Sequence, residues 1–477
     1  MSSTVPSAGS MRTLQPFGFL LTALWIAEVT GSFEAAMVLA AMKYLIHDFG
    51  DPALVGWLVT SYLIVGAAAA ALVGRLGDLF GRRRLMLLVL GVGIAGSIVS
   101  ALSHDFAWLL TGRILQGMTG AILPLAVGLV RENLPRPHVP MGIGLMMSGA
   151  SLGTAAGLIL GGWIADRFGW HGVFYASVIF CAVTMIGVLA FVPKSPVRAH
   201  PGGIDWLSGV LFAPGTMLLL FYVGTIAKLG LANRTGLAAL GAGAGLLAIW
   251  LWRSLRAAEP LMDVRQFGNR TVLVANIVTA LVAASSLQLT LIFTILLQAP
   301  TWTGLGIGIS SFLAGVAKLP SNILSTLAGP LSGWLTGRGG GRWAMLAGGV
   351  LSTAGWVLSY FFHGSLGEII AILCVISFGT TMLFSVAPTV LALAVAHERT
   401  SEVSGMLTVV RGLFQGVGAM LVTTLLATSV VKDPASMGQY PTEAAFRLTL
   451  AVVIGLSVLA TLCAFALPQG HIVEDRA

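Results

Sequence analysis

The chain has 477 residues, of which 56% are hydrophobic and 9% are charged, and its mean hydropathy is +0.92. Soluble domains carry about a quarter charged residues, so this composition excludes a soluble globular protein and indicates a membrane protein. The formal net charge of +8 is typical either of a nucleic-acid-binding surface or of loops on the inner side of a membrane. Because the sequence has no long Lys/Arg run, we expect no nucleic-acid partner.

The three cysteines do not predict a metal site or a disulfide. Cys181, Cys374 and Cys463 all lie inside apolar runs, without the spacing of a metal site or a disulfide framework. We therefore expect neither a metal nor a cofactor.

Residues 1–14 are polar, and the apolar run that follows lacks a convincing cleavage site. That run is expected to be the first membrane span, not a removed signal peptide.

Apolar runs bounded by Gly, Pro or charged residues predict fourteen membrane-spanning helices, each about the length that a tilted helix needs. The predicted spans are 17–46, 54–73, 85–103, 107–131, 139–164, 171–192, 205–227, 236–254, 271–298, 303–336, 343–362, 366–395, 402–429 and 444–467. With this count, most Arg and Lys residues fall in loops on one side, and only Arg167, Lys228, Arg234, Lys432 and Arg447 fall on the other. Basic loops mark the cytoplasmic side, so both termini are expected in the cytoplasm.

The first span contains two acidic residues, Glu28 and Glu34. A carboxyl group in hydrocarbon stays neutral unless its charge is stabilised, so it can exchange protons as solvent access alternates. We expect Glu34 to be the better proton carrier of the two. The alternative is that either acid only hydrogen-bonds a neighbouring helix.

A Gly- and Arg-rich loop, Gly74–Arg84, joins the second and third spans. It resembles the signature loop between the second and third helices of the major facilitator superfamily, although Leu79 stands where the family usually has a basic residue. The matching positions are Gly74, Leu76, Asp78, Gly81, Arg82, Arg83 and Leu85. Asp78 is expected to pair with an arginine of its loop, or to accept backbone N–H groups at a neighbouring helix terminus, as a charge-dependent latch.

In the fourth span, Arg113-Ile-Leu-Gln116-Gly117 resembles the family's second motif. A charge several residues into an apolar helix needs a partner or water. The resemblance implies a buried role for Arg113 in proton coupling, and we place Gln116 in the substrate cavity. The alternative is that Arg113 extends to the outer interface.

In the fifth span, a series of glycines reproduces the spacing of the motif that marks exporters of this superfamily. They include Gly153, Gly157, Gly161 and Gly162. Small residues at this spacing let helix backbones pack closely and bend. The motif's usual proline is Leu158 here, which weakens the inference of export.

Two further spans and an amphipathic stretch, 259–270, separate the halves of the chain and resemble the 14-helix drug:proton antiporter branch of the superfamily. Asp205 is expected only to cap a helix at the membrane edge. The expected fold is all-α and integral to the membrane, of the major facilitator type, with two six-helix bundles plus two inserted helices. The expected domains are 1–195, the first bundle; 196–268, the inserted helices and linker; and 269–477, the second bundle.

The second half repeats the first. Gly333–Arg342 echoes Gly74–Arg83, with Gly337 in the place of Asp78. Lys318 and Arg411 each lie near the middle of a predicted span, where a cation facing lipid is costly. We expect both in the substrate cavity, where they either pair with Glu28 and Glu34 across the two halves or meet an anionic group of the substrate.

These features predict a proton-coupled secondary transporter that exports small organic or amphiphilic compounds by alternating access. Its expected partners are the substrate, protons and the lipid bilayer, and it is expected to be a monomer in the inner membrane. One alternative is an importer of organic acids, or a lipid transporter, without antiport. Another is a membrane sensor that does not transport. An enzyme is not expected, because no loop long enough to hold an active site carries a catalytic or metal-ligating grouping.

Overall fold

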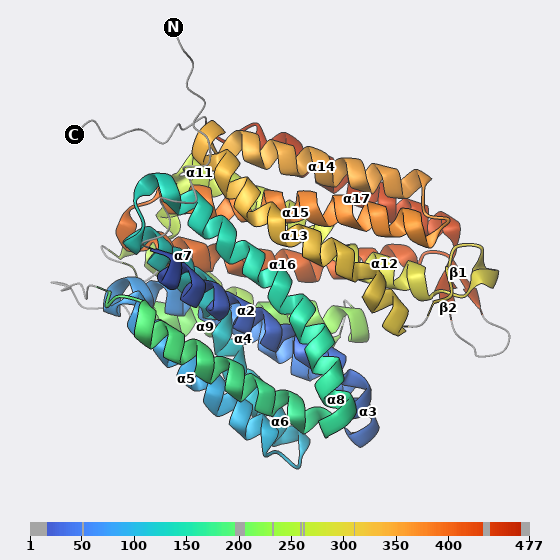
Figure 1. The fold of residues 1–477 in the computed structure, drawn as a ribbon, viewed down its shortest axis with the longest axis horizontal. Helices are drawn as coiled ribbons and strands as arrows, with labels where there is room; N and C mark the ends of the chain where they lie inside the picture. The colour runs from blue at the N-terminus through green and yellow to red at the C-terminus, as the bar shows by residue number, and fades with distance from the viewer. Residues whose placement is uncertain are drawn as a thin grey trace, which may run out of the picture.

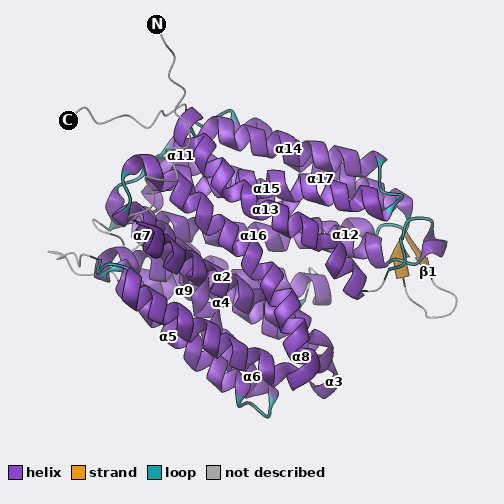
Figure 2. Ribbon diagram, viewed as in Figure 1, coloured by secondary structure: helices purple, strands orange, loops and turns teal. Residues whose placement is uncertain are grey.

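The computed structural model describes residues 17–468, except 50–51, 196–205, 231–232, 258–259, 261–262, 310 and 433–438. Almost all of the described chain is helical (Figure 2). The predicted cap Asp205 and the start of the 259–270 stretch lie outside the described residues. The all-α prediction is therefore confirmed for the part of the chain that the structure describes.

The elements run in chain order as α2 (Gly18–Ala40), α3 (Met42–Phe49), α4 (Pro52–Phe80), α5 (Arg82–Ala101), α6 (Phe106–Gly117), η2 (Met118–Ala121), α7 (Ile122–Asn133), η3 (Arg136–His138), α8 (Val139–Phe191), α9 (Trp206–Leu229), α10 (Arg234–Arg256), η4 (Val264–Gly268), α11 (Arg270–Ala284), η5 (Ser286–Gln288), α12 (Leu289–Gln298), η6 (Thr301–Thr303), α13 (Ser311–Gly339), α14 (Gly341–Phe361), α15 (Leu366–Ala394), η7 (His397–Arg399), α16 (Thr400–Leu426), β1 (Val430–Lys432), β2 (Gln439–Pro441) and α17 (Glu443–Ala464). The two short strands form an antiparallel pair, with Val431 opposite Tyr440.

Helix α8 consists of two helical legs that meet at Gly169. At Gly169 the backbone is non-helical, with φ 67° and ψ 179°, a conformation that glycine adopts without strain. The chain reverses there, so one leg starts at Val139 and the other ends at Phe191 (Figure 1). Eleven of the helices within the described residues are long and apolar enough to cross a membrane, with α8 counted once. With its two legs separate, and with α9 and α13 added, the helices correspond to the fourteen predicted spans.

Two predicted boundaries differ clearly from the structure. The second span was expected to end at residue 73 and a loop to follow over Gly74–Arg84, but α4 continues to Phe80 and α5 begins at Arg82, so only Gly81 separates the two helices.

The tenth span was expected to begin at residue 303, but residues 304–309 form a loop and α13 begins only at Ser311. Gly304 and Gly308 adopt positive φ angles of 74° and 72° in that loop, and such angles do not occur inside a right-handed helix. The apolar composition of 303–309 therefore belongs to a connection and not to a span.

The helices form two bundles. In the first, α2 packs along α8 and α5 packs against α6 and α8; in the second, α14 packs against α15 and α17, and α13 packs against α15. Two seams join the bundles, α4 against α16 and the first leg of α8 against α13. The inserted pair α9 and α10 pack against each other, and α9 also contacts both α4 and α16. The inserted helices thus cover the first seam.

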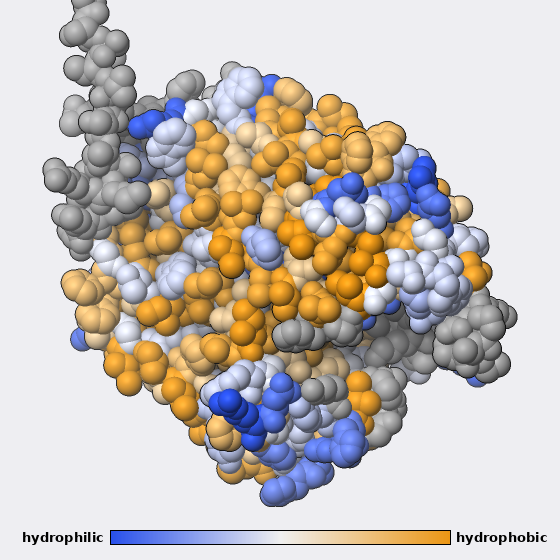
Figure 3. All heavy atoms as spheres, turned by 45° about the vertical axis from the view of Figure 1, so that its right-hand side comes forward, coloured by the Kyte–Doolittle hydropathy of each residue, from blue (hydrophilic) through white to orange (hydrophobic). Residues whose placement is uncertain are grey.

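The outer surface is apolar. Ile179, Val183 and Ile186 on the second leg of α8 are more than half exposed, and they repeat at helical spacing on one face. Figure 3 shows apolar residues over most of one flank, with hydrophilic residues gathered toward its margins. A surface of this kind fits a bilayer and not water.

The bundles meet most closely at one end, which we call the signature-loop end because it carries Asp78. Here a Cβ on Gly74 of α4 would lie 2.5 Å from Ser401 O of the second bundle, and one on Gly333 of α13 would lie 2.3 Å from Pro140 O. Toward the other end, α5 and α6 slope away from α14 and α17 (Figure 1). The structure is therefore closed at the signature-loop end.

Candidate functional site

Glu34 lies in a polar cage inside the first bundle. Its side chain is fully buried. The carboxyl accepts hydrogen bonds from Ser177 Oγ at 2.5 Å, from Thr119 Oγ1 at 2.8 Å and from Ser97 Oγ at 3.3 Å. These three hydroxyls come from α8, η2 and α5, so four separate elements converge on one carboxyl group. Each donor is neutral and can reorient, so the cage can hold either protonation state of the acid.

Arg113 lies beside this cage without forming an ion pair to the Glu34 carboxyl among the described residues. It is fully buried and donates from Nη1 to Gln116 Oε1 at 2.8 Å and to the backbone oxygen of Glu34 at 3.3 Å. Gln116 Nε2 in turn donates to Ser97 Oγ at 2.7 Å and to Glu34 Oε1 at 3.5 Å. Gln116 therefore connects the guanidinium to the carboxyl. This placement excludes an Arg113 that extends to the membrane surface.

The Arg113 guanidinium has further partners on α4. Its Nε donates to Leu58 O at 3.1 Å, and its Cζ lies 4.4 Å from the centre of the Tyr62 ring. Tyr62 Oη also lies 3.0 Å from Thr119 Oγ1, which donates to Glu34. Nη2 of Arg113 is buried without a hydrogen-bond partner within the described residues. The two N–H groups of Nη2 thus remain available for a ligand or water.

Glu28 is separate from this cage. It is buried on α2, and the charge that most affects its carboxyl is that of Arg411 on α16, in the second bundle. The Arg411 guanidinium carbon lies 4.8 Å from the centre of the Phe384 ring, and Arg411 lines a small cavity that Leu123 and Met147 of the first bundle also line. Arg411 therefore lies at the boundary between the bundles, near enough for its charge to act on Glu28, although no hydrogen bond or ion pair joins these two described residues.

Lys318 is not placed with Arg411. Its Nζ donates to Thr290 O at 3.2 Å and to Thr294 Oγ1, both on α12 of the same bundle. Within the described residues, the structure thus leaves Lys318 with neutral oxygen partners.

Asp78 links the two bundles at the signature-loop end. Its Oδ1 accepts from Arg82 Nε at 2.8 Å, four residues further along the chain. Its Oδ2 accepts from the backbone N–H of Glu402 at 2.9 Å, and its Oδ1 from that of Ser401 at 3.3 Å. These amides belong to the first turn of α16, where Arg399 provides no side-chain cap. Asp78 therefore forms both of the contacts expected of the latch.

Arg82 extends the latch. Its Nη2 donates to His397 O at 2.6 Å, and its Nη1 donates to Glu132 Oε2 at 3.1 Å. Gly81, with φ 97°, precedes α5 and lets the chain turn so that Arg82 can reach back to Asp78. Arg83 points elsewhere and donates to Leu189 O at 2.7 Å. Arg82 thus makes contacts between the bundles, and its neighbour Arg83 anchors the first bundle.

The family of the chain can now be stated, because the model for the Major Facilitator Superfamily matches residues 24–325. The chain belongs to the major facilitator superfamily. Members of this superfamily are multi-pass membrane proteins, which agrees with the apolar helices described above. The fold prediction is confirmed with it, since the matched region runs from the first bundle through α9 and α10 into α13.

Relatives agree with this assignment. An uncharacterized MFS-type transporter of Mycobacterium tuberculosis is 30% identical over 67% of this chain, but the match spans only 46% of that relative. The tetracenomycin C resistance and export protein of Streptomyces glaucescens is 28% identical over 71% of this chain and 62% of its own length. Among solved structures, the human organic anion transporter MFSD10 (TETRAN) superposes with a TM-score of 0.66 over 94% of this chain and 99% of its own, at 16% identity. That likeness shows the shared fold.

The glycines of the fifth span in this major facilitator protein face α2. A Cβ on Gly153 would lie 2.4 Å from Val29 O, one on Gly157 would lie 2.8 Å from Phe33 O, and one on Gly161 would lie 3.1 Å from Met37 Cα. Gly162 is looser, because the nearest atom to its Cβ, on Ala40, would be 3.9 Å away. The close stretch of α2 runs alongside Glu34. The glycines therefore hold two backbones in contact where the buried acid lies.

A second ionic cluster was missed by the sequence reasoning. Glu402 is fully buried and accepts from the backbone N–H of Asp263 at 2.7 Å. It lies 3.5 Å from Arg75 and 3.6 Å from Arg399, which also contacts Asp263 at 3.2 Å. An acid in the first turn of a helix usually only provides a favourable charge at its N-terminus. The sequence alone therefore did not indicate that Glu402 belongs to an ionic cluster. Its real role depends on η4, which folds back from α10 onto α16.

Proposed function

We propose that this major facilitator protein is a proton-coupled exporter of small organic or amphiphilic compounds, of the multidrug type. Export is supported by the name of the Streptomyces relative, a resistance and export protein, and by the glycine packing of α8 on α2. Proton coupling is supported by Glu34. A buried acid whose donors are neutral, in a transporter fold, has the property that a proton carrier needs.

Glu34 is the observation that carries the proposal. Its hydroxyl donors come from elements that contact different neighbours, α8 through Ser177 and η2 through Thr119. A shift of α8 along α2 would change the distance between Ser177 and the carboxyl. Losing a donor destabilises the ionised form, so a rearrangement of the helices alters proton affinity. Gln116 and Arg113 would respond to the charge of the acid through the chain of hydrogen bonds.

We also propose that the substrates are neutral or anionic amphiphiles. Arg411 lies at the boundary between the bundles, where its charge acts on Glu28, and Lys318 is a partly buried ammonium with neutral partners. When a substrate or a proton neutralises Glu28, the Arg411 guanidinium is left to bind a carboxylate or phosphate, which it can do through paired hydrogen bonds. A cationic substrate would instead meet Arg411 with repulsion.

The proposal also covers the orientation in the membrane, the branch of the superfamily and the domains. The signature-loop end is placed in the cytoplasm with both termini, because most basic loops lie on that side. The chain is assigned to the 14-helix drug:proton antiporter branch, as a monomer in the inner membrane. Its domains are 1–195, 196–268 and 269–477. In this orientation the structure is closed toward the cytoplasm.

The direction of transport is the decisive test of export. Inside-out membrane vesicles with an acidic lumen expose the cytoplasmic face to added substrate, so an antiporter should accumulate substrate until an ionophore collapses the pH gradient. Vesicles without the protein provide the inactive control. Accumulation only in right-side-out vesicles, driven by external acid, would support the alternative of an organic-acid importer, which the partly buried Lys318 favours.

A further inference from the structure

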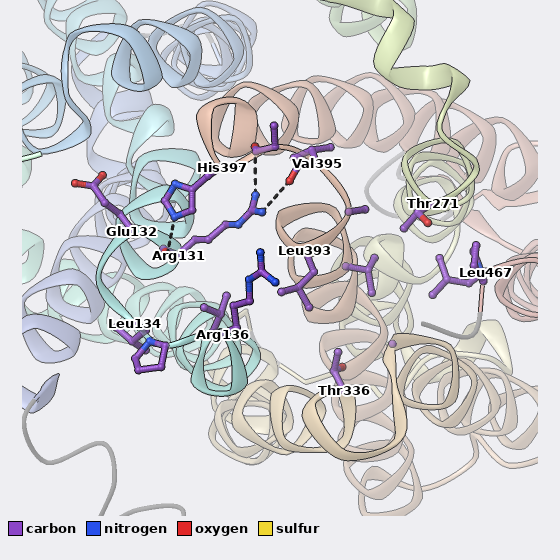
Figure 4. A pocket seen from close by; sticks show the side chains of 17 residues that line it. Arg131, Glu132, Leu134, Arg136, Thr271, Thr336, Leu393, Val395, His397 and Leu467 are labelled. Atoms are coloured by element: carbon purple, nitrogen blue, oxygen red, sulfur yellow. Dashed lines mark hydrogen bonds between the residues drawn. The ribbon is translucent and has the colours of Figure 1, made fainter. Parts of the chain in front are cut away.

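A cavity of about 820 Å³ lies at the signature-loop end, away from Glu34 and Glu28. Its walls come from both bundles (Figure 4). The end of α7 and the start of α8 contribute Arg131, Arg136 and Val139, and α15 with the residues after it contributes Leu393 and His397. The cavity therefore exists only while the two bundles are in contact at this end.

The first wall is positively charged. Arg131 is held in place, because its guanidinium donates to Val395 O at 2.8 Å and to Thr400 Oγ1 at 2.6 Å. The Arg136 side chain extends into the cavity beside it (Figure 4). The lining contains one acid, Glu132, among the described residues, and its carboxylate is 3.1 Å from Arg82. The negative charge of Glu132 is thus already balanced by a guanidinium outside the cavity wall.

Two helix starts add to this positive potential. Val139 and Gly341, the first residues of α8 and α14, both line the cavity. Neither helix has a side-chain cap hydrogen bond at its N-terminus. At α8, however, the Val139 N–H already donates to Arg136 O and Pro140 has no N–H, so the unpaired amides are mainly those of α14. Uncapped amides carry the positive end of the helix dipole, which favours an anion nearby. The arginines and the amides together therefore favour a negatively charged group.

The remaining wall is apolar. Val390 and Leu393 of α15 line it, together with Leu134 and with Leu467 after α17. An inorganic ion would leave this surface without contacts, whereas a ligand with a short apolar part would cover it. The cavity thus combines a cationic side with an apolar side.

We propose that this cavity binds a phosphate- or carboxylate-bearing amphiphile, and that the bound ligand holds the transporter closed at the signature-loop end. The ligand contacts both bundles at once, so it binds the closed state and not the open one. Such a ligand shifts the population toward the closed state by its difference in affinity for the two. It therefore slows any transport cycle that has to open this end. The ligand comes either from the headgroup of an anionic phospholipid or from a soluble phosphate ester.

The test uses the full chain in nanodiscs and two probes that separate these sources. Glycerol 3-phosphate is titrated into nanodiscs of phosphatidylcholine, and a second set of nanodiscs contains phosphatidylglycerol without added ester. Thermal unfolding and the distance between spin labels at Arg84→Cys and Arg338→Cys, in a background without native cysteines, report binding and closure. Arg84 belongs to the first bundle and Arg338 to the second, and both are exposed.

Three variants test whether the probe binds in this cavity. Arg136→Gln removes an exposed cation from the cavity and should weaken binding of the effective probe about tenfold, the value of one charge-assisted hydrogen bond. Arg256→Gln makes the same change on exposed Arg256 of α10, outside the cavity, and should behave as wild type. Leu393→Trp fills the apolar side while keeping both arginines, and should also abolish the response.

Stabilisation and a shorter label distance with either probe, shifted to about tenfold higher probe concentration in Arg136→Gln, lost in Leu393→Trp and kept in Arg256→Gln, would support the proposal. The effective probe then identifies the source of the ligand. The proposal is overturned if neither probe stabilises the wild type, or if Arg136→Gln and Arg256→Gln respond equally. It is also overturned if a probe binds without shortening the label distance.

Discussion

Asp78 of the first bundle caps a helix of the second: its Oδ2 accepts the backbone N–H of Glu402 at 2.9 Å. The same carboxylate holds Arg82 at 2.8 Å. An N-terminal cap and an ion pair are thus combined in one side chain that crosses between the bundles. Because the cap lies between the moving parts, it stabilises only the state in which this end is closed.

Asp78→Asn should impair transport while expression stays normal. Asparagine caps a helix as well as aspartate does, so the main loss is the charge that holds Arg82. We expect the closed state to lose about 1.5 kcal/mol, a tenfold shift in its population. The measurement is the initial rate of substrate uptake into proteoliposomes at matched protein content.

Asp105→Asn is the matched control for this change. Asp105 caps α6 through the N–H of Trp108 at 3.0 Å, inside a single bundle. The amide should replace the carboxylate there at little cost. If both variants transport normally, the latch has no part in the cycle.

Glu402→Gln should destabilise the protein. The glutamine side chain can still accept from Asp263 N–H, but Arg75 loses its charge partner and Arg399 keeps only Asp263. Breaking a buried pair leaves an uncompensated charge, and we expect a loss of at least about 1 kcal/mol, read as a lower thermal unfolding midpoint in detergent. Glu443→Gln removes an exposed pair with Arg447 and should leave that midpoint unchanged, since exposed pairs contribute little. Equal midpoints for the two variants would show that the cluster around Glu402 is not structural.

The glycine motif should divide into essential and tolerant positions. Gly157→Ala would place a Cβ 2.8 Å from Phe33 O, a backbone atom that cannot move away alone, so α8 should separate from α2 and transport should fall. Gly162→Ala, five residues later in the same motif, meets only Ala40 at 3.9 Å and should retain activity. Transport by purified variants of equal thermal stability provides the comparison. A Gly162→Ala variant as impaired as Gly157→Ala would mean that the packing in this structure does not govern activity.

Arg411→Gln should relax the preference for anionic over cationic substrates. The change removes the cation whose charge acts on Glu28 and leaves the helix intact. Matched anionic and cationic compounds of similar size would be compared for transport, with Lys318→Met as the second variant. Because Lys318 has neutral partners on α12, its substitution should also lower anion transport if it lines the pathway. Strong cation export by wild type, indifferent to both substitutions, would refute the proposed charge preference.

Much of the fold followed from the sequence, because spans and the internal repeat leave local signatures. Gly81 and Gly340 occupy equivalent places in the repeat, and both adopt positive φ, 97° and 83°, at the start of a helix. A glycine between two charged helix ends predicts such a turn. Apolar length predicted the spans equally well, except where Gly304 and Gly308 interrupt the chain.

Less of the candidate sites than of the fold could be predicted from the sequence. The latch was expected because Asp78 shares the signature segment with several arginines, but the cap on α16 joins residues more than three hundred positions apart. No local pattern could reveal that Glu402 would meet Asp263, or that Ser97, Thr119 and Ser177 would surround Glu34. Serine and threonine in apolar helices bond their own backbone as often as a neighbour, so their partners depend on tertiary packing.

The central claim is that Glu34 carries the coupled proton, and one experiment tests it most directly. Wild type, Glu34→Gln and Glu28→Gln are reconstituted at equal density, and substrate transport is measured with and without an imposed pH gradient. Glutamine keeps the shape of the side chain but cannot titrate. We predict that Glu34→Gln abolishes the response to the gradient while substrate still binds, and that Glu28→Gln has a milder effect. A Glu34→Gln variant that still responds to the gradient, or a Glu28→Gln variant that is the more damaged, would contradict the account.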